Sequence, residues 1–422
     1  MRRTGESILW GLFCTSSWTW CIGMYLPFIL LRLWGWPGFW AFFIPNVLGC
    51  TAFGFVLDRE RSQALMRRLG WTCALFSAVT VAYQAYFAGW AAQYFVVGGG
   101  TLATVAATGV PAAMLLAGGA LALRGGALRS RLLPVLALRH AQALRPALAM
   151  RGDAFWCALG AVAAVVSGVL LLLPRSVPAL DPGGELTARM SDAAAATTEQ
   201  GALVGLGALG FALPTIAAGF LLSPYFDLTF HRAAQEAPQP RVAFATFGLT
   251  FAAMLLGVAS CYDPQTGGPA ITWPLVAVWG LQLFFTMSVH LRELLLAESA
   301  VRIPAAAALG PMALAVLLAT PAFLFTLGPS VPAERGLVGG SLHALLPGEP
   351  IYLCFLGAYG LLFPVLAILE PRGLPRRALL AVLGVGLPCY LLGAYGFQTA
   401  LMPVPILAAL AIAAWPGARR MA

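Results

Sequence analysis

The chain has 422 residues, of which 60% are hydrophobic and only 10% are charged. A soluble domain cannot bury so much apolar surface, so the composition predicts a polytopic membrane protein. The net charge of +9 does not indicate a nucleic-acid partner, because every basic residue is arginine and most lie in alternate loops. The eight cysteines stand singly, without metal-ligand spacing, so they are interpreted as packing residues and no metal or cofactor is expected.

The first apolar span, residues 6–33, is long enough to cross a bilayer, yet its centre is polar. Backbone groups freed at bilayer depth cannot face lipid, so an interrupted helix there must be buried in protein or line a watery cavity. We expect such an interruption. The alternative is a continuous helix whose serines and threonines bond to their own carbonyls. The residues at this centre are Thr15, Ser16, Ser17, Trp18, Thr19, Trp20, Cys21 and Gly23.

Further apolar spans bring the total to about twelve crossings, with both termini on the arginine-rich side. That side is the cytoplasm, so the expected location is the inner (cytoplasmic) membrane. A basic connection with a short surface helix follows the fourth span, an acidic loop follows the fifth, and the whole chain forms one domain. The later spans are residues 37–57, 70–97, 101–123, 154–173, 201–225, 242–262, 271–291, 304–327, 347–369, 378–397 and 401–415.

The spans divide into two halves of opposite orientation, residues 6–173 and 201–369, with extra helices in 378–415. In the sixth span, Pro214 and Thr215, with a glycine shortly after, predict a break between residues 212 and 220. Two interrupted spans at corresponding positions are typical of inverted-repeat transporters. The predicted fold is therefore all-α, an inverted five-plus-five repeat in which helices 1 and 6 are broken.

Two short segments resemble a known family. Residues 223–232, SPYFDLTFHR, are similar to the inner end of the sixth helix in the sodium:solute symporter family. Residues 285–290, FTMSVH, are similar to that family's Met-Ser-Ser/Thr segment in span 8. The chain thus resembles a divergent member of this family within the amino-acid–polyamine–cation superfamily. The resemblance implies the five-plus-five fold and a symporter-like activity.

The resemblance also implies a sodium site, made by carbonyls of span 1 and two adjacent hydroxyls of span 8. Here Ser288 is followed by Val289, and Thr286 lies on a different helical face from Ser288. With Thr15, these two hydroxyls form a weakened candidate cation site. His290 offers proton coupling instead, because imidazole titrates near neutral pH; the alternative is a solvated histidine at the end of span 8.

Polar groups from other spans are expected around the two breaks. A glutamine without partners is costly in hydrocarbon, so Gln84 and Gln282 should face the interior, either toward a substrate or only joining helices. Asn46 is interpreted as capping a kink beside Pro45. No charged residue falls at mid-depth of a predicted span. The candidate substrate-binding residues are Ser16, Ser17, Trp18, Thr19, Trp20, Tyr83, Gln84, Pro214, Thr215 and Gln282.

The predicted topology places Arg32 and Glu349 at the outer ends of spans 1 and 10, where they would form an outer gate. Inside, Arg2 or Arg3 would pair with Glu293 or Glu298 at the end of span 8. Exposed ion pairs contribute less than about 1 kcal/mol, which suits a gate that opens repeatedly. Unpaired charges at the headgroups are the alternative for each pair.

The leading hypothesis is a secondary transporter of a small organic solute, coupled to sodium or protons. The alternative is a non-transporting membrane subunit or scaffold that reuses the fold. An enzyme is not expected, because the sequence has no histidine-rich cluster and no His-Glu metal motif. The expected partners are the solute and the lipid bilayer, with a protein partner left open. Residue types alone identify neither the solute nor the coupling ion.

Overall fold

The computed structural model is mostly helical in the part of the chain that it describes. Six helices there are long and apolar enough to cross a membrane, which makes this a membrane protein with several spans. A single two-stranded hairpin interrupts the helices of this part, with β1 (Tyr262–Asp263) antiparallel to β2 (Gly268–Pro269). The described residues are 2–95, 100–122, 145–173, 202–264, 268–301, 349–370, 376–394 and 399–415.

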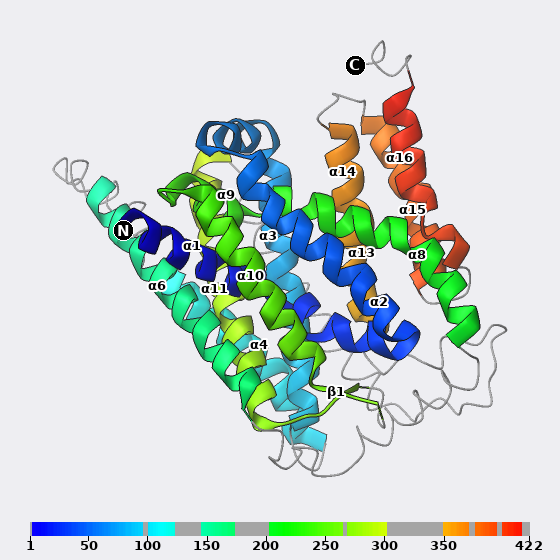
Figure 1. The fold of residues 1–422 in the computed structure, drawn as a ribbon, viewed down its shortest axis with the longest axis horizontal. Helices are drawn as coiled ribbons and strands as arrows, with labels where there is room; N and C mark the ends of the chain where they lie inside the picture. The colour runs from blue at the N-terminus through cyan, green and yellow to red at the C-terminus, as the bar shows by residue number, and fades with distance from the viewer. Residues whose placement is uncertain are drawn as a thin grey trace.

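The helices fall into two groups and a C-terminal pair (Figure 1). The first group comprises α1 (Arg2–Trp18), α2 (Cys21–Val56), α3 (Arg59–Phe95), α4 (Gly100–Ala122) and α6 (Arg145–Leu172). The second group comprises α8 (Ala202–Leu222), η3 (Ser223–Phe226), α9 (Leu228–Glu236), α10 (Pro240–Ala259), α11 (Trp273–Val301), α13 (Glu349–Gly357), η5 (Ala358–Leu362) and α14 (Phe363–Leu369). The chain then continues with α15 (Arg376–Ala394), η7 (Thr399–Leu401) and α16 (Val404–Ala414).

The predicted interruption of the first span is confirmed, because α1 ends at Trp18 and α2 begins only at Cys21. The rest of the first span and all of the second are merged in α2, which bends sharply at Gly35 (Figure 1). Gly35 has a φ of 61°, a left-handed conformation that glycine adopts without steric cost. The tight turn expected at this glycine is therefore present.

The predicted position of the second interruption is wrong. Helix α8 runs through Pro214 and ends at Leu222, and the irregular segment is η3 together with Asp227. A proline inside a membrane helix is tolerated where neighbours satisfy the freed backbone groups. The break therefore lies several residues after the Pro–Thr pair that was expected to cause it.

Other boundaries differ in smaller ways. The seventh span ends at Ala259, because Tyr262 belongs to the hairpin, and α11 continues to Val301 beyond the expected end of the eighth span. The tenth span contains a π-helical turn, η5, that the sequence did not predict. The predicted ninth span, the acidic loop and most of the basic connection lie outside the described residues.

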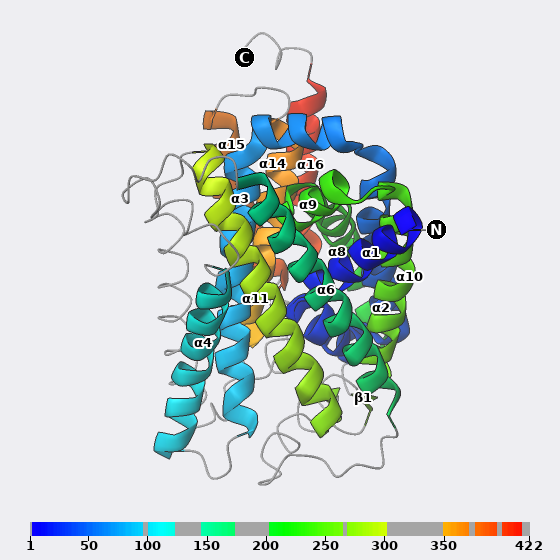
Figure 2. The ribbon, with the colours of Figure 1, turned by 90° about the vertical axis from the view of Figure 1, so that its left-hand side faces the viewer.

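Packing places the broken helices at the centre of the bundle. Helix α1 lies between α6 and α10, while α2 packs against α8 and α10 (Figures 1 and 2). Figure 2 shows α3, α4 and α11 running side by side on the opposite flank, in agreement with their contacts. Large apolar side chains remain exposed on outward faces, among them Leu116 at 75%, Leu172 at 86% and Leu249 at 77% exposure. A lipid environment accounts for such faces.

A close backbone approach joins α2 to α8 and gives the first prediction. A Cβ on Gly49 would lie 2.4 Å from the Phe220 carbonyl oxygen and 2.8 Å from Leu221 Cα. Gly49→Ala should therefore lower the free energy of unfolding by about 1–3 kcal/mol, because the helices must separate. Thermal unfolding in detergent measures the loss. Gly168→Ala is the matched control, since nothing lies within 4 Å of its Cβ position; an equal effect of both variants would contradict the prediction.

Candidate functional site

The first break lies between α1 and α2, at Thr19 and Trp20. Trp20 has an extended backbone, with φ −84° and ψ −179°, so the helical ladder stops there. The backbone N–H of Cys21, at the start of α2, donates to Oε1 of Gln84 at 3.3 Å. Gln84 on α3 thus satisfies one of the donors that a new helix leaves open. The other amide atom of Gln84, Nε2, is buried and has no hydrogen-bond partner.

The second break lies between α8 and α9, where Asp227 caps the short helix α9. Its Oδ1 accepts hydrogen bonds from the Thr229 backbone N–H at 2.6 Å and from the Thr229 hydroxyl at 2.7 Å. Asp227 is fully buried. Asp227 lies just after the predicted end of the sixth span at residue 225, so a buried carboxylate stands at the second break.

The two breaks meet. The Thr229 hydroxyl, at the start of α9, lies 2.9 Å from the Ser17 hydroxyl in the last turn of α1. Ser17 donates its own hydroxyl hydrogen to the Cys14 carbonyl at 3.2 Å, so Ser17 acts as an acceptor toward Thr229. A direct polar contact therefore links the end of one broken helix to the restart of the other.

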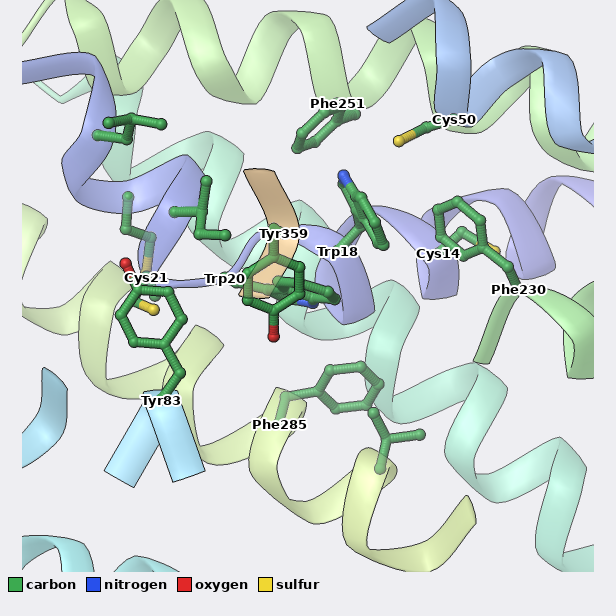
Figure 3. Close-up of a cluster of buried hydrophobic side chains, with 14 of the residues drawn as sticks. Cys14, Trp18, Trp20, Cys21, Cys50, Tyr83, Phe230, Phe251, Phe285 and Tyr359 are labelled. Carbon is green, nitrogen blue, oxygen red and sulfur yellow. The ribbon is translucent and has the colours of Figure 1, made fainter. Parts of the chain in front are cut away.

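Aromatic rings pack together beside this contact, and Figure 3 shows Trp18, Trp20 and Tyr359 close to one another. Trp18 and Trp20 lie 4.4 Å apart between ring centroids, and Tyr359 lies 5.1 Å from Trp20. Tyr359 belongs to the π turn η5; its hydroxyl lies 2.9 Å from that of Thr80, and its carbonyl accepts the Ser223 hydroxyl at 3.2 Å. One residue of the turn that leads into α14 thus contacts α3 and both breaks. π turns of this kind are frequent at functional sites.

A cavity of about 10 Å³ lies at the breaks, near the lower limit that holds one water molecule. It is too small for an organic solute, so this conformation is closed around the site. Asn46 on α2 lines the cavity and accepts the Trp18 indole N–H at 2.9 Å. It therefore does not cap a kink in its own helix, as had been expected. The lining residues are Trp18, Trp20, Ile22, Gly23, Asn46, Phe220, Ser223 and Tyr359.

The structure brings only part of the predicted substrate set to the breaks. Ser17, Thr19 and Gln84 lie there, with the tryptophans and Tyr83, which Figure 3 shows beside Cys21. Ser16 instead donates to the Gly160 carbonyl of α6 at 2.8 Å.

The remaining predicted substrate residues point elsewhere. Thr215 donates to the Met402 carbonyl at 2.7 Å, so it and the adjacent Pro214 belong to the α8–α16 side of the bundle. Gln282 donates to the Ser167 hydroxyl at 2.7 Å and joins α11 to α6. Their polarity reflects contacts between helices, which residue type alone does not distinguish from binding.

The three hydroxyls of the predicted cation site do not converge. Thr286 donates to the Ser16 carbonyl at 3.1 Å, and so reaches helix α1. Thr15 lies 2.5 Å from the Thr250 hydroxyl on α10. Ser288 bonds back to the Phe284 carbonyl on the face toward α4. Thr286 and Ser288 lie on different faces of α11, as predicted. Only the Thr286 hydroxyl therefore faces α1, where the resemblance implies two adjacent hydroxyls.

His290 is completely buried rather than solvated, contrary to the alternative considered for it. Its Nδ1 lies 3.0 Å from the Ser77 hydroxyl on α3, and its Nε2 lies 3.9 Å from Oδ2 of Asp227. Sequence reasoning missed Asp227 as a site residue. A signal was present, because Asp-x-Thr after Pro224 is a favourable start for a new helix.

Charged pairs lie at both ends of the central helices. Arg32 Nη2 is 2.5 Å from Glu349 Oε2, with the two side chains 1% and 0% exposed, so this predicted pair is buried rather than exposed. Tyr25 donates to the same carboxylate at 3.0 Å. A buried pair of this kind is strongly destabilised when one partner is removed.

The predicted pairing of Arg2 or Arg3 with Glu293 is wrong. Glu293 binds Arg232 of α9 at 3.0 Å and also Arg292, which in turn binds Asp153 of α6. Arg2 and Arg3 are exposed, and the side chain of Glu298 lies outside the described residues. The network therefore joins α6, α9 and α11 without the N-terminal arginines.

These features define an all-helical membrane protein with two facing helix breaks and a closed aromatic site between them. No protein-family model, curated protein or solved structure matches the chain. Its function is therefore inferred from this geometry. All eight cysteines are free thiols, and the described residues contain no cluster of metal-binding side chains.

The bond between Trp18 and Asn46 gives a second prediction. Asn46→Leu should lower the free energy of unfolding by about 1–3 kcal/mol, because it leaves a buried indole N–H without its acceptor. Trp18→Phe removes the donor, so the double variant should lose less than the sum of the two single losses. Thermal unfolding of all four proteins in detergent measures the coupling. Trp36→Phe, at an exposed tryptophan, is the control; strictly additive losses would contradict the pairing.

Proposed function

We propose that the protein is a secondary transporter that moves a small organic solute by alternating access. The observation that carries this proposal is the meeting of two helix breaks, with the Ser17 and Thr229 hydroxyls 2.9 Å apart beside a small cavity. Secondary transporters bind their solutes where interrupted helices face each other. The helix starts at Cys21 and Leu228 direct their positive dipole ends toward this region, which favours a polar group beside the Asp227 carboxylate.

The pattern of helix contacts supports an inverted five-plus-five repeat. A pseudo-twofold axis requires that each contact between the halves has a counterpart with the roles exchanged. Helix α1, the first of one half, packs on α10, the second of the other, and the second span, within α2, packs on α8. The third helices of the two halves, α3 and α11, pack on each other. The proposal therefore includes twelve spans and a kinship with sodium:solute symporters.

The proposed orientation puts both termini in the cytoplasm of a cell with an inner membrane. The Arg32–Glu349 pair then closes the outer side, between α2 and α13. The network around Glu293 closes the inner side, between α6, α9 and α11. Alternating access would open one of these sets while the other stays closed.

The alternative is a non-transporting membrane subunit or scaffold that reuses this fold. One observation favours it: the cavity at the breaks has a volume of only about 10 Å³ and is walled by packed aromatic rings. In a transporter these rings must separate to admit a solute, whereas in a subunit they stay packed.

Purified protein in liposomes separates the two functions and gives the third prediction. Sugars, amino acids and vitamins are screened for uptake, each with and without a sodium or pH gradient. A transporter should accumulate at least one compound, and that compound should raise the thermal unfolding temperature, because ligand binding stabilises the folded state. If no compound is accumulated and none shifts the unfolding temperature, the subunit function is favoured.

The buried pair gives a fourth prediction. Glu349→Gln should change the uptake rate of the compound found in the screen by about tenfold or more, because the closed state loses a buried charge pair and 1.4 kcal/mol corresponds to a factor of ten. Initial uptake rates in liposomes measure the change. Asp58→Asn is the control, since the Asp58–Arg61 pair is 62% and 70% exposed and contributes little. An unaltered rate in Glu349→Gln would exclude the gate.

A further inference from the structure

Two buried titratable side chains, Asp227 and His290, face each other beside the breaks, and the two atoms that approach each other have no hydrogen-bond partner. Both side chains are 0% exposed, and Oδ2 of Asp227 lies 3.9 Å from Nε2 of His290. Neither atom has a hydrogen-bond partner, although every other polar atom of these two side chains has one. The Ser17 carbonyl also faces the imidazole, but no hydrogen bond reaches Nε2.

We propose that Asp227 and His290 together bind one proton, and that this proton is the coupling ion of the proposed transporter. Without the proton, an ionised carboxylate faces a neutral imidazole, and the pair carries one buried negative charge. A proton from solvent removes that charge, and the neutral pair is then joined by O–H to nitrogen or N–H to oxygen. An approach of about 1 Å brings the two atoms to hydrogen-bond distance.

Other charged groups near the pair are already engaged with one another. Glu293 on α11 is bound to Arg232 and Arg292, and Arg292 is also bound to Asp153. The uncharged titratable groups that interact electrostatically with Asp227 are Cys14 on α1, Cys50 on α2, Cys73 on α3 and Tyr359 on η5. His290 is thus the one basic side chain within ion-pair distance of Asp227 in the described part of the chain.

Protonation of Asp227 affects the contact between the helix breaks through the Thr229 hydroxyl. The single hydroxyl hydrogen of Thr229 has two acceptors within reach, Asp227 Oδ1 at 2.7 Å and the Ser17 hydroxyl at 2.9 Å. An ionised carboxylate is the stronger acceptor and holds this hydrogen on α9. A protonated Asp227 is weaker, so the hydrogen turns to Ser17 and ties α9 to α1. Proton binding would therefore strengthen the contact that joins the two broken helices.

The hydroxyls of the predicted cation site argue against sodium as the coupling ion. The hydroxyls of Thr15, Thr286 and Ser288 point to three different helices, so they supply no common set of oxygens. Sodium is a hard cation that needs several oxygen ligands together. A proton needs only the two facing atoms of Asp227 and His290.

Acid–base titration of the purified protein in detergent tests the site, with the proton itself as the probe. The number of protons bound is measured against pH for the natural protein and for Asp227→Asn and His290→Asn. Asparagine at 227 still accepts from the Thr229 backbone, and asparagine at 290 keeps a polar atom near Ser77, so both variants should fold. Each variant should lose one proton-binding step or displace it by at least about one pH unit.

His231→Asn is the matched control. His231 is also fully buried on α9, but its ring nitrogens bind the Ser62 hydroxyl at 2.8 Å and the Tyr225 carbonyl at 3.0 Å. This variant should keep the step at the same pH. A step that persists unchanged in either Asp227→Asn or His290→Asn would overturn the proton site.

The inference rests on the proposed transport function. The uptake assay distinguishes a failure of proton coupling from a failure of the transport function. For the compound accumulated in liposomes, a pH gradient should drive uptake by the natural protein and by His231→Asn, but not by Asp227→Asn or His290→Asn. Uptake that follows only a sodium gradient overturns proton coupling and leaves transport standing. If no compound is accumulated while both variants lose the proton-binding step, the transport function is contradicted, whereas Asp227 and His290 remain supported as a proton-binding site.

Discussion

The structure depends on one constraint: backbone polar groups freed inside a membrane must find partners within the protein. The chain meets it at both breaks with side chains from neighbouring segments. Gln84 of α3 accepts the first N–H of α2, and Asp227 accepts the N–H of Thr229 at the start of α9. These caps allow two helices to stop and restart at the centre of the bundle. The facing hydroxyls, the aromatic walls and the Asp227–His290 pair all follow from that arrangement.

Much of the architecture was predictable because it follows from composition and local pattern. Hydrophobic length predicted the spans now seen as α6, α10 and α15, and the polar centre at Thr19 and Trp20 predicted the first break. The second break was placed several residues early. Pro214 is a helix breaker by intrinsic preference, but membrane helices accommodate proline, whereas the cap formed by Asp227 actually restarts the chain.

The site itself was only partly predictable, because residue type does not reveal where a side chain points. Gln84 and Gln282 look alike in sequence, yet one caps a broken helix and the other joins α11 to α6. The pairing of Arg32 with Glu349 was foreseen from topology, but their complete burial was not. The alternative of a solvated His290 assumed that the eighth span ends near this residue; α11 continues to Val301 and leaves His290 buried.

The π turn at η5 gives Tyr359 a distinctive position. A π turn holds one residue more than an α turn, so it shifts the helical phase of the residues before it relative to the residues after it. In the chain from α13 to α14, this extra residue helps to set the direction of the Tyr359 ring, whose centroid lies 5.1 Å from that of Trp20. The aromatic wall of the cavity therefore depends on the helical register between α13 and α14.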